Sequence, residues 1–369
     1  MDHARTPALD AIASRANSVS TAWSSSTWTV PSMISMFTGM PVRQHGWNRE
    51  PGNVRTFPKV PPAPMLAEVM RHKGYETTAL VANDFVDPDL GFSRGFDTWR
   101  KTLDSQAPAR VATEVAGWAP GSRHFLYVHL LGPHSPLHPS EAAREHHGVD
   151  ARWIEGHPLG FLIGEAKRGQ EPGVREAYRN AYRAVVEDVD TRIGAILEGL
   201  GEHRDDTLVV ITSDHGELLG EHGVFGHGWW VYEELVHVPL IVEGGVSLPD
   251  RVSGASIPAI ITESLDLEHT WPTPHDATLL VSERRDRLAL SVDGVHKGIW
   301  TEESAEAFSL DTDRGEQSPG PVSQALSEAR EHFLASTPAG TYTDDEVRLN
   351  DATLESLRAL GYLDAGSPP

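Results

Sequence analysis

An acid and three histidines follow an apolar run in the middle of the chain. Residues 207–211 form that run, and its pattern predicts a buried strand. Asp214, His215, His222 and His227 fall within the fourteen positions 214–227, three of them beside glycines that permit close approach. Carboxylate and imidazole ligands at the carboxyl end of a strand are typical of divalent metal sites in α/β enzymes. The alternative is that Asp214 caps a turn on a histidine-bearing surface loop, but the clustering favours a hydrolytic metal site.

Secondary-structure elements must position this cluster. Along the chain, apolar runs typical of strands alternate with stretches typical of helices. This pattern predicts an α/β fold with a mostly parallel sheet and helices on both faces. The predicted strands cover residues 78–82, 125–131, 207–211 and 238–242, and the clearest predicted helices cover residues 64–74 and 174–200.

From residue 247 onward, short runs of alternating apolar and polar residues are broken by turn residues. This pattern predicts a small antiparallel subdomain. We therefore expect a catalytic α/β domain at 1–246 and a small C-terminal subdomain and tail at 247–369. A helix is expected within 256–267. Residues 311–345, rich in Asp, Glu, Ser, Gly and Pro, are predicted to be loop.

Composition narrows the function classes. The chain of 369 residues has 39% hydrophobic content, enough for a sizeable core, and a formal net charge of −22. That charge disfavours nucleic acid and anionic membranes as partners, and an anionic substrate would need a local positive centre such as a metal ion. The absence of Cys removes disulfides and thiolate ligands. The sequence shows no leader peptide and no run long enough to span a membrane, so we expect a cytoplasmic protein by default.

A second candidate for chemistry is Thr29, which stands just before Pro31. Residues 31–36 can open a helix with proline in its first turn. The Thr29 hydroxyl would then lie near a helix N-terminus, where unpaired N–H groups and the helix dipole favour an oxyanion. A phosphoryl or sulfuryl group could be held there. The alternative is that Thr29 serves only as an N-cap.

These motifs together resemble the sulfatase family, within the alkaline phosphatase superfamily. The metal-binding half is represented by Ser-Asp-His-Gly-Glu at 213–217, Gly-Glu-His-Gly at 220–223, Gly-His-Gly at 226–228, Tyr-Glu-Glu at 232–234 and Val-Pro-Leu-Ile at 238–241. Similar segments stand at 6–10, 29–32, 38–39, 45–46, 132–136 and 357–363. The resemblance therefore extends over nearly the whole chain.

The resemblance implies a role for each matched position. Thr29 corresponds to the nucleophile and, with Asp214 and His215, to the metal ligands. His134 corresponds to the residue that faces the leaving-group oxygen. Substrate-binding positions are His227, which matches a family Lys or His that contacts the anionic group, and Asn83, which lies where other members place an anion-binding Lys. For His129 and His138 the residues themselves favour packing or surface roles.

Two departures from the family pattern bear on the chemistry. Sulfatases that form formylglycine carry Cys or Ser at the nucleophile position and Arg after Pro-Ser, whereas this chain has Thr29 and Met33. No formylglycine is expected, and the pattern is closer to members that attack phosphodiesters or phosphonates through an unmodified Thr. A metal bound to the hydroxyl would lower its pKa. Manganese, zinc, calcium and magnesium all remain open.

The family also begins with a strand that ends in metal-ligating aspartates. This chain starts at Met1-Asp2-His3, and neither Asp2 nor Asp10 is a good substitute. We therefore hold two hypotheses. The first is a metal-dependent hydrolase of sulfate or phosphate/phosphonate esters, with a small anionic ester as substrate, whose first strand lies upstream of the given start. The second is an inactive, N-terminally truncated homologue that acts as an anion-binding protein. The oligomeric state stays open.

Overall fold

The computed structural model describes residues 4–19, 21–48, 56–150, 172–245, 247–272, 279–340, 346–351 and 353–355. The family-like tail at 357–363 and Asp2 lie outside these residues.

Two three-stranded sheets carry the site. In one, β4 (Glu76–Val81) lies between β5 (Thr98–Lys101) and β6 (His124–His129), and all three strands are parallel. In the other, β10 (Leu240–Glu243) lies between β1 (Asn17–Ser18) and β7 (Val209–Thr212), and both pairs are antiparallel. All four predicted strands are present, and the α/β fold is confirmed.

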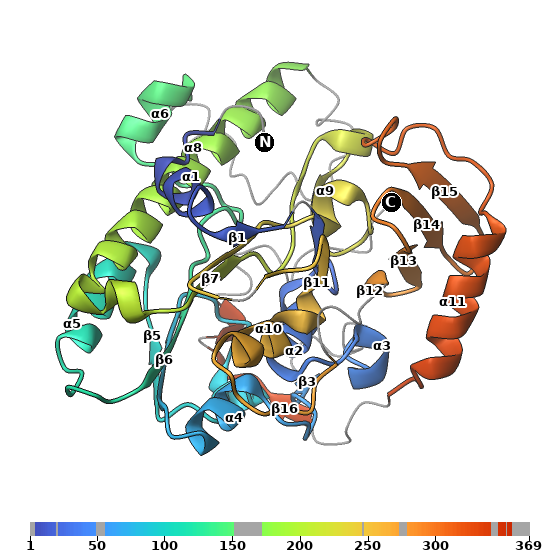
Figure 1. Ribbon diagram of the computed structural model, residues 1–369. Coiled ribbons are helices and arrows are strands. Elements are labelled where there is room, and N and C mark those ends of the chain that lie inside the picture. The colour runs from blue at the N-terminus through green and yellow to red at the C-terminus, as the bar shows by residue number, and fades with distance from the viewer. Residues whose placement is uncertain are drawn as a thin grey trace.

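Successive apolar side chains of the parallel sheet point to opposite faces, so both faces need cover. Helices cover both of them (Figure 1). Leu80 on β4 packs with Val111 and Val115 of α5 (Ala107–Val115) on one face. Ala79 and Val81 point to the other face, toward α2 (Thr29–Thr38) and α4 (Leu66–His72).

The predicted long helix is α8 (Pro172–Glu198), which contacts α1 (Pro7–Ala13), α5 and α6 (Glu141–His147). Tyr178, Ala181 and Val185 form its buried stripe. The carboxylate of Asp190 accepts hydrogen bonds from the backbone N–H groups of Ala8 and Leu9, and so fastens the first turn of α1 to α8.

The predicted antiparallel subdomain is a four-stranded meander. Its strands are β12 (Leu280–Arg284), β13 (Arg287–Ser291), β14 (His296–Trp300) and β15 (Ala305–Ser309). The prediction that 311–345 is loop is wrong for α11 (Gln324–Ser336), which packs on this sheet. Its polar composition belongs to the solvent face, whereas Leu326 and Phe333, seven positions apart, are buried on the other.

Other residues after 246 return to the first part of the chain. The strand β11 (Arg251–Ser253) pairs in parallel with β2 (Thr21–Trp23), and β16 (Glu346–Arg348) pairs with β3 (Thr56–Pro58). The expected helix is α10 (Ile257–Ser264), which packs against α2. The division at residue 246 stays a prediction, because the large core includes segments from both sides of it.

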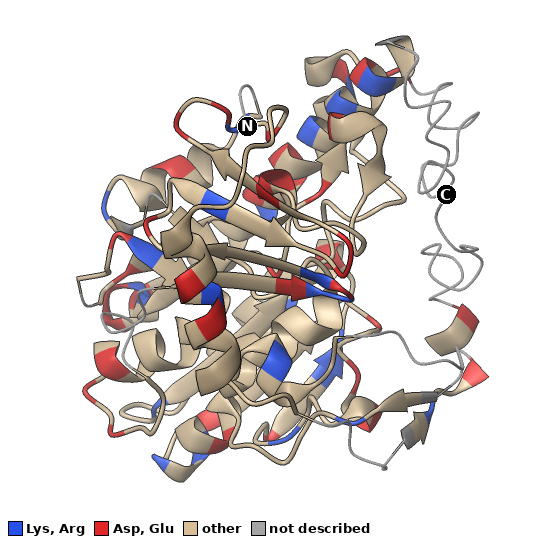
Figure 2. Cartoon of the chain, turned by 90° about the vertical axis from the view of Figure 1, so that its right-hand side faces the viewer, with Lys and Arg blue, Asp and Glu red and all other residues tan. Residues whose placement is uncertain are grey.

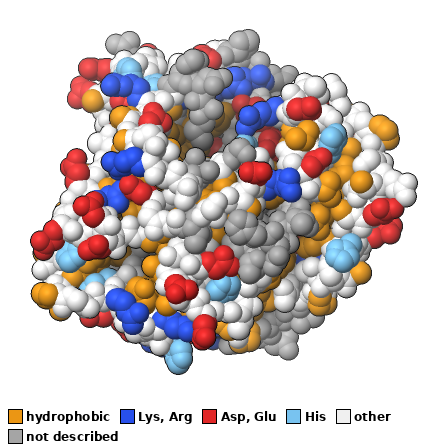
Figure 3. Space-filling model, viewed as in Figure 1, with side chains coloured by type: hydrophobic (Ala, Val, Ile, Leu, Met, Phe, Trp, Pro, Cys, Tyr) orange, Lys and Arg blue, Asp and Glu red, His pale blue; other side chains and the backbone are white. Residues whose placement is uncertain are grey.

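Acidic and basic side chains are interspersed on the face seen in Figure 3, and Figure 2 shows both kinds of residue in many of the described elements. Within the described ranges, no helix combines the length and the apolar character needed to cross a membrane.

One buried acid should make the stability of the fold depend on pH. Glu283 on β12 is 7% exposed and accepts a 2.6 Å hydrogen bond from the N–H of Arg43 in α3 (Val42–His45). Burial raises the pKa of Glu283 to about 7, despite that hydrogen bond and the charge of Arg43. The folded state therefore binds the proton more tightly than the unfolded chain, and stability falls as pH rises from about 4.5 through 7.

We expect Glu283→Gln to remove this part of the pH dependence, because glutamine keeps an acceptor for Arg43 and cannot ionise. Urea unfolding of both proteins between pH 4.5 and 8 measures it, with Asp286→Asn, an ionisable neighbour at the β12–β13 turn, as the control. The difference in the free energy of unfolding should approach a few kcal/mol, at about 1.4 kcal/mol per pKa unit. Parallel pH profiles for wild type and E283Q would contradict the assignment.

Candidate active site

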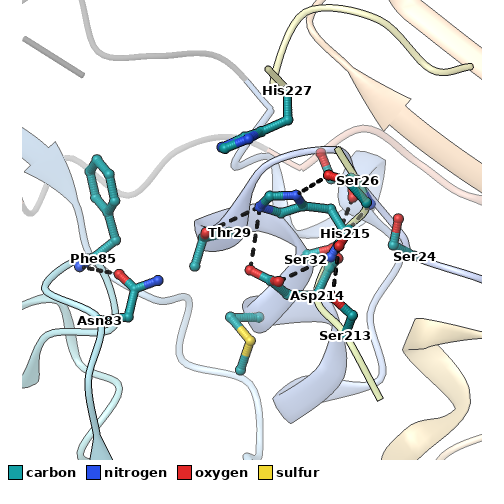
Figure 4. A network of polar contacts seen from close by, with 12 residues as sticks. Ser24, Ser26, Thr29, Ser32, Asn83, Phe85, Ser213, Asp214, His215 and His227 are labelled. Carbon is teal, nitrogen blue, oxygen red and sulfur yellow. Dashed lines mark hydrogen bonds and ion pairs between the residues drawn. The ribbon is translucent and has the colours of Figure 1, made fainter. Parts of the chain in front are cut away.

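The site forms where the loop after β7 meets the N-terminus of α2 (Figure 4). Asp214 and His215 follow β7 directly, and the next residue, Gly216, lies against the backbone of α9 (Glu233–Val236). A Cβ at Gly216 would overlap the carbonyl oxygen of Glu234, so this close approach requires glycine. The tight turn holds the two candidate ligands next to α2.

Thr29 is the first residue of α2, and its N-cap is Trp28. Thr29 therefore does not serve as the N-cap. Its Oγ1 lies 3.4 Å from Nε2 of His215 (Figure 4). The hydroxyl of Ser32, one turn further on, lies 2.5 Å from the carbonyl oxygen of Asp214 and joins α2 to the β7 loop. Helix and loop thus fix the hydroxyl, imidazole and carboxylate together.

The tautomer of His215 follows from its contacts. Nδ1 lies 2.8 Å from the carbonyl oxygen of Gly216, which can only accept a hydrogen bond, so Nδ1 carries a proton. In the neutral ring, the lone pair of Nε2 then faces the Asp214 carboxylate, whose Oδ2 is 3.5 Å away. Two electron-rich atoms at this separation favour a cation between them.

The charge state of Asp214 agrees with this arrangement. Burial alone would raise the pKa of Asp214, but the positive charge that His215 and His129 carry when they are protonated, together with a hydrogen bond from Thr29, outweighs it and places the pKa below its usual value. The carboxylate is therefore ionised at neutral pH.

Asn83 stands across from Thr29, at the end of β4 (Figure 4). Its side-chain oxygen accepts a hydrogen bond from the N–H of Phe85, and its amide nitrogen lies 3.4 Å from Nε2 of His129. Nδ1 of His129 lies 2.7 Å from the hydroxyl of Tyr127. His129 thus lines the pocket but mainly holds Asn83 in place, in keeping with the packed role expected for it, and His138 is exposed.

His134 and His227 come from other segments of the chain and lie near His215. The His227 ring lies 4.2 Å from the His215 ring and 5.0 Å from the His134 ring, centroid to centroid. Glu217, which sequence reasoning did not single out, binds Nδ1 of His227 at 3.0 Å. Burial raises the pKa of Glu217 to about 7, and burial together with His227 lowers the pKa of His134 to about 4. The position of Glu217 directly after Asp-His-Gly was the available signal.

The predicted cluster at 214–227 divides in the structure. Asp214, His215 and His227 meet as described, but His222 sits at the tip of the hairpin formed by β8 (Leu218–Leu219) and β9 (Phe225–Gly226), and contacts Glu234 instead. His222 therefore does not belong to this site.

The pocket itself contains carboxylates and imidazoles but neither Lys nor Arg among its described lining residues. These are Thr29, Asn83, His129, Leu130, Leu131, Pro133, His134, Tyr182, Ser213, Asp214, His215, Gly216 and Glu217. Met33, which replaces the family's Arg, is buried in the main core.

An α/β fold with oxygen and imidazole donors at a strand end is typical of hydrolytic enzymes. The Sulfatase family model matches residues 2–255, so this chain belongs to the sulfatase family, and the resemblance seen in its motifs is confirmed.

Similar proteins and solved structures are consistent with membership of this family. N-acetylglucosamine-6-O-sulfatase from Bacteroides thetaiotaomicron is 33% identical over 136 residues, which cover 36% of this chain and 23% of that protein. The phosphonate monoester hydrolase of Silicibacter pomeroyi has a similar fold, with a TM-score of 0.67 at 19% identity, over 91% of this chain and 90% of that one. A structure solved with D-glucosamine-2-N,6-O-disulfate also has a TM-score of 0.67, at 16% identity over 97% and 94% of the two chains.

Proposed function

We propose that the protein is a metal-dependent hydrolase of sulfate or phosphate/phosphonate esters with Thr29 as its nucleophile. The observation that carries the proposal is the convergence of the Thr29 hydroxyl, the His215 lone pair and the Asp214 carboxylate at the N-terminus of α2. Family membership and the two kinds of structural neighbour, a sulfate-ester complex and a phosphonate hydrolase, support the reaction class.

The donor set fits part of the shell of a divalent ion. Asp214 and His215 supply an ionised oxygen and an unprotonated nitrogen, and Thr29 supplies a hydroxyl oxygen. Among the described lining residues there is neither Lys nor Arg, although an anionic substrate must bind beside Asp214. When bound, the metal would neutralise the ester's oxygens and lower the pKa of the Thr29 hydroxyl.

The protein's own groups then divide the reaction into two steps. Thr29 Oγ1 loses its proton to solvent and attacks sulfur or phosphorus, and the ester bond to the leaving oxygen breaks. Water or another acceptor then cleaves the Thr29 ester and restores the hydroxyl. The backbone N–H groups at the start of α2 and the Asn83 amide would orient the anion.

His134 would protonate the departing oxygen. Burial and His227 keep this imidazole neutral in the free protein, but a bound dianionic or anionic ester would raise its pKa again. The acid form would therefore be populated once substrate is present.

The second candidate function is an anion-binding protein without turnover. In its favour, the Asp214 carboxylate and the His215 imidazole are the only charged or imidazole groups that join Thr29 as potential metal ligands among the described residues. A tight metal site usually has more ligands than this. Metal-dependent turnover would exclude this candidate.

The metal ligands are tested by Asp214→Asn and His215→Ala. We expect each variant to bind manganese or zinc at this site at least ~100-fold more weakly and to lose metal-dependent hydrolysis, because the first-row ion loses a direct ligand. Titration calorimetry and turnover of bis-p-nitrophenyl phosphate measure the two effects. Asp84→Asn, an acid near the pocket wall that pairs with Lys101, is the control. Near-normal turnover in D214N or H215A would rule out the assignment.

Thr29→Ala should reduce turnover by ~10³-fold or more, whereas Thr29→Ser should keep part of it, because only Ser retains a nucleophilic oxygen. Phosphodiesters or phosphonates should be cleaved faster than aryl sulfates. Mass spectrometry of enzyme quenched during turnover should find the phosphoryl adduct on the Thr29 peptide. Preferred aryl-sulfate cleavage by an enzyme that survives T29A would overturn the alkoxide mechanism.

The acid role of His134 is tested by varying the leaving group. His134→Ala should lower turnover of an alkyl ester by ~10²-fold or more and that of a p-nitrophenyl ester much less, since only the poor leaving group needs a proton. His138→Ala, an exposed neighbour on the same segment, should change neither rate. Equal losses for both substrates would place His134 in binding instead of proton transfer.

A further inference from the structure

A second group of potential ligands lies away from the active-site pocket. His222, Glu234 and Glu316 come from three separate segments, and one ligand atom of each lies within 4.8 Å of the other two. His222 is at the tip of the β8–β9 hairpin, Glu234 is on α9 and Glu316 is in the segment after β15. Figure 1 shows α9 beside the C-terminal sheet, so this group joins that sheet to the central part of the fold.

The ligand atoms are buried without hydrogen-bond partners. Nε2 of His222, Oε2 of Glu234 and Oε1 of Glu316 all have this property. The Glu316 side chain is fully buried, and its Oε1 lies 2.9 Å from Nζ of Lys297 outside hydrogen-bond geometry. Nε2 of His222 lies 3.5 Å from Oε2 of Glu234, also outside that geometry. Oε1 of Glu316 is paired with Lys297 by charge, but Nε2 of His222 and Oε2 of Glu234 are buried without a hydrogen bond, which is costly and marks them as candidate ligand atoms.

The charges in this place are also unbalanced. Two carboxylates, Glu233 at 3.4 Å and Glu316 at 2.9 Å, pair with the one fully buried ammonium group of Lys297, and Glu234, next to Glu233, adds a third carboxylate. A divalent cation would balance the two remaining negative charges. The backbone adds a further sign, because His222 and Glu316 both adopt positive φ angles, 53° and 50°, that non-glycine residues rarely hold without compensation.

We propose that His222, Glu234 and Glu316 bind a divalent transition-metal ion that fastens the β8–β9 hairpin to the C-terminal sheet. One imidazole nitrogen and two carboxylate oxygens suit zinc or manganese, whose bonds of ~2.1 Å place neighbouring ligands about 3.0–3.4 Å apart. The three atoms lie within 4.8 Å of one another, so they would move closer together around the ion. The ring of His222 is held by stacking on Tyr232, with centroids 3.7 Å apart and planes at 9°.

Binding through Nε2 requires the imidazole proton on Nδ1. The amide nitrogen of Gln317 now lies 3.4 Å from Nδ1 and 2.7 Å from the carbonyl oxygen of Gly315. Because this nitrogen donates to the Gly315 carbonyl, the Gln317 side chain would have to move away from Nδ1 when the ion binds, which leaves the Nδ1 proton to solvent. The ion would then stabilise the hairpin whose base carries Glu217 and His227, two residues beside the active-site pocket.

Zinc binding by the Asp214→Ala protein tests the proposal independently of the active site. We expect this variant to retain one zinc per chain, measured by elemental analysis after dialysis against buffered zinc, and to gain several degrees in Tm over the chelator-treated protein. Adding His222→Asn or Glu234→Gln should weaken zinc binding at least tenfold and remove the Tm gain. Asn is chosen because it tolerates a positive φ, and Glu234→Gln tests the site without touching that backbone.

The matched control is His146→Asn with His147→Asn. These histidines also gather around a carboxylate, Glu187, but they already bind it at 2.7 and 2.9 Å and lie nearer the surface. The control should keep the zinc and the Tm gain. Absence of zinc from D214A, or zinc that survives both H222N and E234Q, or zinc lost only in the control, would overturn the proposal. Because all comparisons are made in D214A, failure of the proposed hydrolase activity would not affect this result.

Discussion

The contact between His215 and the carbonyl oxygen of Gly216 sets the chemistry of the whole pocket. It places the imidazole proton on Nδ1 and turns the lone pair of Nε2 toward Asp214 and Thr29. Everything around it serves to keep that geometry. Gly216 admits the backbone of α9, and Ser32 joins the helix that carries Thr29 to the loop that carries Asp214. Under the proposed function, a cation would bind between these electron-rich atoms.

The charges that line the pocket also bear on how an anionic substrate could bind. The described pocket lining has carboxylates and imidazoles, while α2 contributes only the partial positive charge of its N-terminus. One structural neighbour is a phosphonate monoester hydrolase, which by its name acts on an anionic ester. The proposed role of Thr29 as nucleophile fits an electron-rich pocket, because a hydroxyl depends more on a nearby cation for its activation than an aldehyde hydrate does.

The sequence predicted which residues come together more fully than it predicted the residues that hold them. Thr29, Asp214 and His215 were chosen from a strand end, a helix start and the family resemblance, and the structure places them side by side, while their roles stay predictions. Glu217 was missed because its contact with His227 depends on how the hairpin folds back, although its place directly after Asp-His-Gly was a signal. His222 was grouped with the wrong partners, since the hairpin at 218–226 turns it toward α9. The helix α11 was missed because its apolar positions are few and lie among polar residues that composition assigns to loop.

The position of a bound ion is the most direct measurement of this arrangement. Crystals soaked in manganese and measured at its absorption edge should give an anomalous peak within ~2.0–2.3 Å of an oxygen of Asp214 and of Nε2 of His215, with Oγ1 of Thr29 at its edge. That result would establish the cation that the tautomer of His215 calls for. A saturating soak that leaves no anomalous peak between Asp214 and His215 would contradict the metal-dependent site.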